Sequence, residues 1–218
     1  MDLQEFKSKY YFFDLNEYRS IFVFIDFGNV RHWAKEFWPE ENKYRLCVEI
    51  DIEKLARVCE WVEPKKKFFY YGYFSERNDL PKNHQLNIKH SKSIYRINKA
   101  GKCGFKKRTK EIKMVPHYDE EGKFLGKFPK CNFDVEITMD MMMKIEKYET
   151  IMLFSGDSDF KGLLSYLKNK DKKIVVVCTR NRMSDELEEA ADKFIPAETL
   201  ASFLRYEIKN TPPFRAEV

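Results

Sequence analysis

Short apolar runs that end abruptly in acidic or polar residues recur along this chain. The run at 151–154 is followed by Ser155 and two aspartates, and the run at 21–25 is followed by Asp26. The most regular run, at 172–178, reads KKIVVVC. Continuous apolar runs of this length are typical of strands that are buried on both faces of a parallel sheet. The pattern therefore predicts a central sheet whose strands end in polar residues.

Segments with the apolar spacing of helices lie between these runs. Alternation of strands with helices indicates an α/β fold, in which helices cover both faces of a mainly parallel sheet. Helices are expected at 51–62, 80–97, 134–145 and 160–167, in a short stretch after Ser184, and at 198–204. Further strands are expected at 68–74 and 193–195.

The chain of 218 residues is long enough for one sizeable core, and no linker divides it. One domain is expected over residues 21–205. Aromatic and charged residues at 1–20 predict an N-terminal arm, and residues 206–218 predict a loose C-terminal tail. Between the helices at 80–97 and 134–145, the residues 114–127 predict an inserted basic hairpin that turns at Asp119–Gly122.

Composition excludes several classes of protein. The five cysteines form no CxxC pair, so neither a disulfide framework nor a zinc site is expected. The N-terminus lacks the features of a signal peptide, and no apolar stretch approaches the roughly 20 residues that cross a bilayer. A cytoplasmic location without a membrane partner is the default. No phosphate-binding glycine motif is present, which disfavours a nucleotide cofactor.

Aspartates follow two of the predicted strands. Asp157 and Asp159 lie in the turn after the strand at 151–154, and Asp26 ends the strand at 21–25. The carboxyl ends of neighbouring parallel strands lie along one edge of a sheet, so these acids should come together. Asp134, at the start of a helix, could join them. A helix cap would explain each acid alone, but two acids two residues apart exceed what one cap requires.

Several carboxylates within a few ångströms repel one another unless their pKa values rise or a cation binds. Oxygen ligands without a nearby histidine or cysteine favour Mg²⁺ or Mn²⁺ over zinc. Such ions serve phosphoryl chemistry, including cleavage of a nucleic acid backbone. The sequence therefore predicts a divalent metal site at this edge of the sheet.

A dense basic run occupies residues 99–113, with a single acid among its cations. A solvated face and a loop that contacts phosphates explain it equally well. The cations with an expected role in RNA binding are Lys102, Lys106, Lys107, Arg108 and Lys110 from this run, together with Arg31, Arg180 and Arg182.

Four ordered motifs carry a resemblance to a known family. They are IDFGN at 25–29, NFDVEITMDM at 132–141, SGDSDF at 155–160, and S-x-x-L with AADKF at 184–194. In combination they resemble the NYN domain family, a branch of the PIN-like ribonuclease fold. The resemblance covers about residues 21–200 and implies a three-layer α/β/α, Rossmann-like fold and a metal-dependent endoribonuclease that uses Mg²⁺ or Mn²⁺.

The resemblance also implies roles for individual residues. Asp26, Asp134, Asp157 and Asp159 are expected to bind the metal and carry catalysis, with Asn29, Ser155 and Asp140 supporting them. Asp140, however, lies about 240° around the helix from Asp134. The expected partner is RNA, single-stranded or structured, and a homodimer stays open. The alternative is a PIN-like RNA-binding or scaffold protein without turnover.

Overall fold

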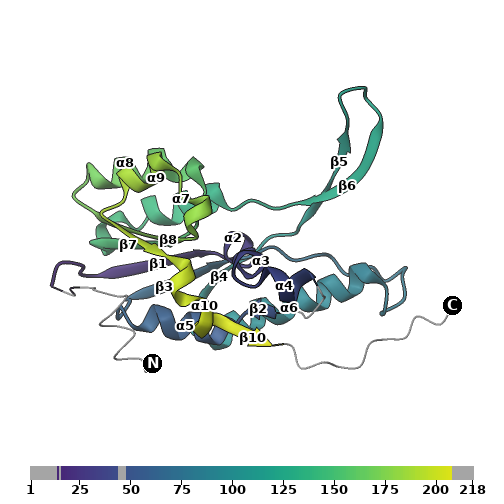
Figure 1. Ribbon diagram of the computed structural model, residues 1–218, viewed down its shortest axis with the longest axis horizontal. Helices are drawn as coiled ribbons and strands as arrows, with labels where there is room; N and C mark the ends of the chain where they lie inside the picture. Colours follow the sequence, from purple (N-terminus) through teal and green to yellow (C-terminus); the bar gives the residue numbers. More distant parts are fainter. Residues whose placement is uncertain (1–13, 15, 44–47, 208–218) are drawn as a thin grey trace.

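Six parallel strands form the central sheet (Figure 1). The computed structural model describes residues 14, 16–43 and 48–207. The strand order is β4-β3-β1-β7-β8-β9. These strands are β1 (Ile21–Asp26), β3 (Lys66–Tyr70), β4 (Lys106–Arg108), β7 (Thr150–Phe154), β8 (Lys173–Cys178) and β9 (Lys193–Pro196). The predicted strands at 21–25, 151–154, 172–178 and 193–195 are confirmed.

Helices cover both faces of the sheet, so the predicted three-layer α/β/α fold is confirmed. In Figure 1, α7, α8 and α9 lie on one face, and α5, α6 and α10 lie on the other. The helices are α2 (Phe27–Val30), α3 (Trp33–Phe37), α4 (Pro39–Lys43), α5 (Ile52–Glu60), α6 (Gln85–Lys102), α7 (Asp134–Met142), α8 (Lys161–Lys168), α9 (Asp185–Ala190) and α10 (Ala201–Leu204). Short 3-10 helices are η1 (Ile145–Lys147), η2 (Ser158–Phe160), η3 (Arg180–Arg182) and η4 (Ala197–Leu200). Within the described ranges, no helix combines the length and apolarity needed to cross a membrane.

Burial explains why the central strands read as continuous apolar runs. Every residue of β7 is buried, and β1 is buried up to Ile25. Aromatic rings fill the space beside β1, where Phe24 stacks on Phe68 with ring centroids 5.1 Å apart. Because both faces of these strands meet helices, the alternation of a half-exposed strand is absent.

The predicted strand at 68–74 is shorter than expected, because β3 ends at Tyr70. The chain then passes under the base of the insertion at Gly72. A Cβ atom at this position would lie 2.7 Å from the Sγ atom of Cys131 and 2.7 Å from Ile112. The backbones of Tyr71 and Tyr73 still donate hydrogen bonds to the carbonyl oxygens of Arg108 and Lys110, so this segment runs beside the continuation of β4 without forming a regular strand.

The predicted helix at 80–97 is displaced along the chain. Helix α6 begins at Gln85, after His84 accepts a hydrogen bond from the backbone of Leu86. The preceding residues form a loop that Asn87 holds through three hydrogen bonds from its amide nitrogen to backbone oxygens. The helix ends at Lys102, so the first part of the basic run is helical.

A small antiparallel pair of strands was missed by the pattern. β2 (Val48–Ile50) pairs with β10 (Arg205–Glu207). β10 therefore includes the first two positions of the expected tail at 206–218, and residues 208–218 lie outside the described residues. Of the expected arm at 1–20, residues 1–13 and 15 also lie outside them, and the buried Tyr18 belongs to the core.

The expected insertion is an antiparallel hairpin of β5 (Lys113–Tyr118) and β6 (Phe124–Lys130). Its turn lies where the sequence predicts it. The Asp119 carboxylate accepts backbone hydrogen bonds from Glu121 and Lys123, and Gly122 adopts a φ of 80°. Figure 1 shows the hairpin extending away from the three layers.

The order of the strands determines where a site can form. From β1 the chain builds the sheet toward β3 and β4, and later it builds from β7 toward β8 and β9 on the other side. β1 and β7 are therefore neighbours whose connections diverge, with Ile25 opposite Phe154. Open α/β sheets bind ligands outside the carboxyl ends of strands at such a switch point.

Candidate functional site

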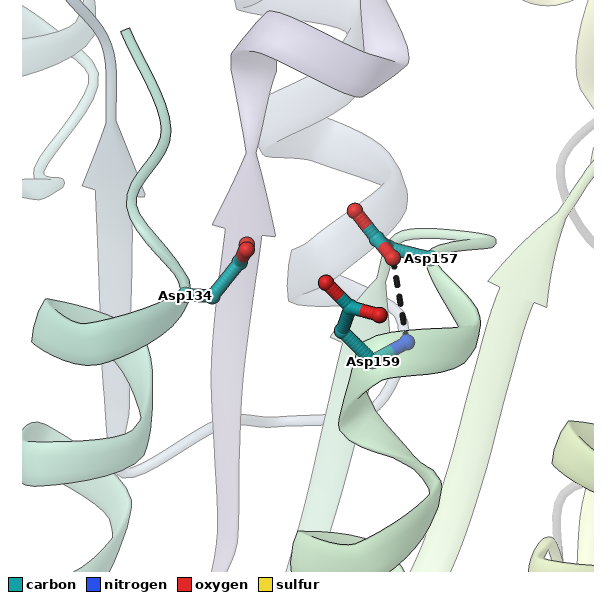
Figure 2. A group of neighbouring side chains, drawn as sticks. All are labelled: Asp134, Asp157 and Asp159. Atoms are coloured by element: carbon teal, nitrogen blue, oxygen red, sulfur yellow. Dashed lines mark hydrogen bonds between the residues drawn. The ribbon is translucent and has the colours of Figure 1, made fainter.

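Three carboxylates meet at the switch point. Asp134, Asp157 and Asp159 each offer an oxygen atom, and these atoms lie within 4.8 Å of one another. Figure 2 shows Asp134, at the start of α7, facing Asp157 and Asp159, which lie in the turn between β7 and α8. The structure thus brings together three of the four acids that the sequence places at one site.

The turn after β7 holds its acids by local hydrogen bonds. The buried hydroxyl of Ser155 accepts a 3.3 Å hydrogen bond from the backbone of Asp157. The Asp157 carboxylate in turn accepts a 3.0 Å hydrogen bond from the backbone of Asp159 (Figure 2). Gly156 lies so close to Arg182 that a Cβ atom would approach the Arg182 carbonyl oxygen at 2.9 Å. The short SGDSD turn therefore packs against the backbone of Arg182, whose guanidinium forms a 2.5 Å ion pair with Glu36.

Asp26 ends β1 and lines the same cavity as Asp134 and Asp157. Its carboxylate accepts a 3.2 Å hydrogen bond from the backbone of Asn29 and so caps α2. Burial, with smaller contributions from the charges of Asp134 and Asp157, raises the pKa of Asp26 to about 6. Asp26 therefore both caps α2 and faces the cavity, so its position fits a capping role and a role in the site.

Asp134 is the first residue of α7, where the sequence places the start of this helix, and not its N-cap, so the capping explanation of this acid does not apply. The N-cap residue is Phe133, which makes no side-chain capping hydrogen bond. The side-chain oxygen of Asn132, one residue earlier, accepts a 2.9 Å hydrogen bond from the backbone of Asp134. The Asn132 amide nitrogen also donates to the Asp134 carboxylate. Burial raises the pKa of Asp134, and the charges of Asp157 and Asp159 raise it further. The hydrogen bond from Asn132 lowers this pKa but does not cancel the rise.

Asn29 adds an oxygen atom that has no partner. Its side-chain oxygen is buried and, among the described residues, accepts no hydrogen bond. Asn29 lines the cavity with Asp26 and Asp134. A buried amide oxygen normally has a partner, so this atom indicates a missing ligand. An amide oxygen beside carboxylates matches the ligands of Mg²⁺ and Mn²⁺, and the residues present therefore fit such an ion.

The cavity beside these acids has a volume of about 650 Å³ and a second, basic wall. Helix α6 contributes Lys89, Lys92 and Arg96, whose spacings of three and four residues place them on one helical face. Arg31 and Arg182 line the cavity as well. Sequence reasoning missed the α6 cations. Their helical spacing is visible in the sequence, but which face meets the cavity depends on packing.

A buried tyrosine organises part of the basic wall. The Tyr71 hydroxyl accepts a 3.0 Å hydrogen bond from Arg31. Arg96 lies near the same hydroxyl and donates to both carboxylate oxygens of Glu49, at 2.6 and 2.7 Å. Among the described residues, Arg31, Lys89 and Lys92 form no ion pair, so their charges are available to an anionic ligand.

Asp140 lies away from the acidic cluster, in agreement with its angle on the helix. It is buried and forms ion pairs with Arg108, at 2.7 Å, and with Lys144, and it accepts a 2.8 Å hydrogen bond from Tyr70. Although burial opposes the change, these donors lower the pKa of Asp140 to about 2. The network occupies the Arg108 guanidinium as well, so this cation of the basic run has a partner within the protein.

The remaining predicted RNA-binding cations lie outside the cavity. Lys110 pairs with Glu136 at 2.6 Å. Lys106 and Lys107 are exposed on β4, the edge strand of the sheet, and Lys102 is exposed near the end of α6. Arg180 is exposed on η3. Of the eight cations expected from the sequence, only Arg31 and Arg182 therefore line the cavity that contains the acids.

Comparisons with known proteins show the family and the fold of this chain. A sequence model of the NYN domain matches residues 20–201. The Low amplitude and bright protein LabA of Synechococcus elongatus is 34% identical over 110 residues, which cover 50% of this chain and 59% of LabA. The crystal structure of VPA0982, a protein of unknown function from Vibrio parahaemolyticus, has a TM-score of 0.55 and 20% identity, with 84% of this chain and 96% of that chain covered. This likeness concerns the fold.

Proposed function

This chain belongs to the NYN domain family, and from this premise we propose that it is a metal-dependent endoribonuclease. Asp26, Asp134, Asp157 and Asp159 would hold Mg²⁺ or Mn²⁺, with the Asn29 side-chain oxygen as a further ligand. The observation that carries the proposal is one cavity that is lined by acids (Asp26, Asp134 and Asp157) and by cations (Arg31, Lys89 and Lys92) that form no ion pair among the described residues. A phosphodiester with its metal ion fits both sides of this cavity, because the phosphate is negative and the metal ion is positive.

The acidic side of the cavity supplies the metal site. Hydrogen bonds within the turn hold Asp157 and Asp159, while Asn132 orients Asp134. Raised pKa values at Asp26 and Asp134 mean that their negative charges are unfavourable without a counterion. Asp26, Asp134, Asp157 and Asp159 would hold a divalent ion as that counterion, and such an ion would supply the activation of water that phosphodiester hydrolysis needs.

The basic side of the cavity orients the substrate. Lys89 and Lys92 can neutralise backbone phosphates, and Arg31 is held toward the cavity by Tyr71. Phosphate contacts of this kind position a nucleic acid without reading its bases. They also keep the anionic strand beside carboxylates that would otherwise repel it. The α6 cations are therefore proposed to replace the predicted basic run as the principal phosphate contacts near the acids.

The test is incubation of the purified protein with labelled RNA and DNA oligonucleotides in Mg²⁺, Mn²⁺ and EDTA. Cleavage of internal RNA bonds in metal but not in EDTA is expected. Asp157→Ala should lack this cleavage, whereas Asp185→Ala, which removes an acid from the first turn of α9, should retain it. Undiminished cleavage in EDTA would contradict the metal site. RNA binding without cleavage in any metal would instead support the PIN-like RNA-binding or scaffold protein.

A further inference from the structure

The β5–β6 hairpin leaves the domain at the rim of the cavity. Ile112, just before β5, and Pro129, Cys131 and Asn132, at the end of β6, all line the cavity. Building on the proposed function, we propose that this hairpin binds single-stranded RNA. Its aromatic rings would stack on unpaired bases of the strand that runs between the cavity and the solvent.

Packing within the domain does not explain the aromatic residues of the hairpin. Tyr118 is 59% exposed, Phe124 is 54% exposed and Phe128 is 50% exposed. The rings form two separate pairs: Tyr118 and Phe124 have centroids 5.7 Å apart, and His117 and Phe128 have centroids 5.0 Å apart. A two-stranded hairpin is at best marginally stable in water, and exposed rings that gather on one favour a ligand.

The charges of the hairpin favour a polyanion as that ligand. Its two strands carry Lys113, Lys127 and Lys130 and no acid. The acids are confined to the turn, at 119–121. A strand of RNA can therefore follow the hairpin from the cavity toward the turn, with phosphates near the lysines, as far as the rings of Tyr118 and Phe124 that flank the turn.

The aromatic rings indicate single-stranded RNA and not a duplex. Bases in a duplex stack on one another, so exposed rings reach the faces of unpaired bases only. Stacking of this kind tolerates any base, because every base has a π face. The hairpin would therefore extend the binding site by a few nucleotides without adding sequence preference, and longer strands would bind more tightly than strands that fill only the cavity.

Fluorescence anisotropy in EDTA tests this with labelled single strands of about 4 and about 16 nucleotides, which span the range of known single-strand site sizes. Phe124→Ala and Phe128→Ala together should weaken binding of the long strand by about ten-fold or more. The short strand should bind as it does to the wild type. Phe124→Trp should retain the affinity, because tryptophan keeps a ring that stacks.

Leu125 offers a matched control, because it is 55% exposed on the same strand and has no ring. Leu125→Ala should leave the affinity for both strands unchanged. These variants should fold, since the altered side chains lie outside the core. Thermal unfolding of each variant is the measurement that checks this. Equal losses from Leu125→Ala and from the double phenylalanine variant would overturn the stacking proposal.

Other outcomes are equally decisive. A long strand that binds the double phenylalanine variant and the wild type equally would overturn the hairpin proposal while leaving the nuclease proposal intact. Sedimentation that shows a wild-type dimer, dissociated by the phenylalanine changes, would assign the surface to a second copy of this chain and overturn it as well. If the wild-type protein neither binds nor cleaves RNA, both proposals are overturned. The wild-type measurement comes first, so this outcome is distinguished from failure of the hairpin proposal alone.

Discussion

Replacing Asp26 by Asn should stabilise the protein in the absence of metal. A rise of the Asp26 pKa from 3.8 to about 6 is roughly two pKa units, each worth about 1.4 kcal/mol. The ionised carboxylate therefore lowers the free energy of unfolding by about 3 kcal/mol at pH 7. Asn keeps the oxygen that accepts from the Asn29 backbone and removes the charge, so a gain of about 1–3 kcal/mol is expected.

The pH dependence has a definite sign. Between pH 3.8 and about 6, the folded state holds a proton on Asp26 that the unfolded state has lost. The contribution of Asp26 to stability therefore falls as the pH rises through this window. The difference between Asp26→Asn and the wild type should be near zero below the window and reach its full size above it.

Asp140→Asn is the matched control, because the same chemical change should have the opposite sign. Ion pairs with Arg108 and Lys144, together with Tyr70, hold the pKa of Asp140 at about 2. The ionised form thus stabilises the protein above pH 3.8, and this stability is lost as the pH falls toward 2. At pH 7 the variant should lose about 2 kcal/mol.

Urea unfolding of the three proteins at several pH values, in EDTA and in millimolar Mn²⁺, measures these effects. Metal should stabilise the wild type and Asp140→Asn by about 2.7 kcal/mol at a hundred times the dissociation constant. Asp26→Asn should lose most of this gain. Destabilisation by Asp26→Asn in EDTA, or equal stabilisation of all three proteins by Mn²⁺, would refute the assignment of Asp26 to the metal site.

Three further results are expected. Lys89→Ala with Lys92→Ala should weaken RNA binding and reduce its salt slope by about two, whereas neutralising Lys106 should change the slope less; filter binding at several salt concentrations distinguishes them. Asp157→Ala should abolish stabilisation by Mn²⁺ in thermal melts and cost about 1 kcal/mol in EDTA through the lost cap. Gly156→Ala should destabilise the fold by about 1–3 kcal/mol, because its Cβ atom would overlap Arg182, and urea unfolding measures this.

The sequence predicts the acidic side of the site well, for a physical reason. A buried strand must end where its apolar run ends, and parallel strands share their carboxyl edge. The positions of Asp26, Asp157 and Asp159 therefore follow from local pattern and the fold class alone. The orientation of Asp134, the first residue of α7, depends on a hydrogen bond to Asn132 that the apolar pattern does not predict.

The basic side could not be predicted from local pattern. The basic run at 99–113 does not form one surface in the fold. Its first part ends α6, its middle forms the edge strand β4, and Lys110 forms an ion pair. The α6 cations that reach the cavity, Lys89, Lys92 and Arg96, lie before this run and are spread along the helix. Only the packing of that helix beside Tyr71 and Glu49 shows which face meets the acids.

Unpaired charges of both signs share this cavity without neutralising each other. Among the described residues, Asp26, Asp134, Asp157 and Asp159 form no ion pair, whereas Asp140 on the same helix as Asp134 forms two. This separation of acids from cations fits a ligand that carries both charges. The metal ion would bind to the acids, and the RNA phosphates would bind to the cations of α6. Because each bound charge offsets repulsion of the other, metal and RNA should each raise the affinity for the other.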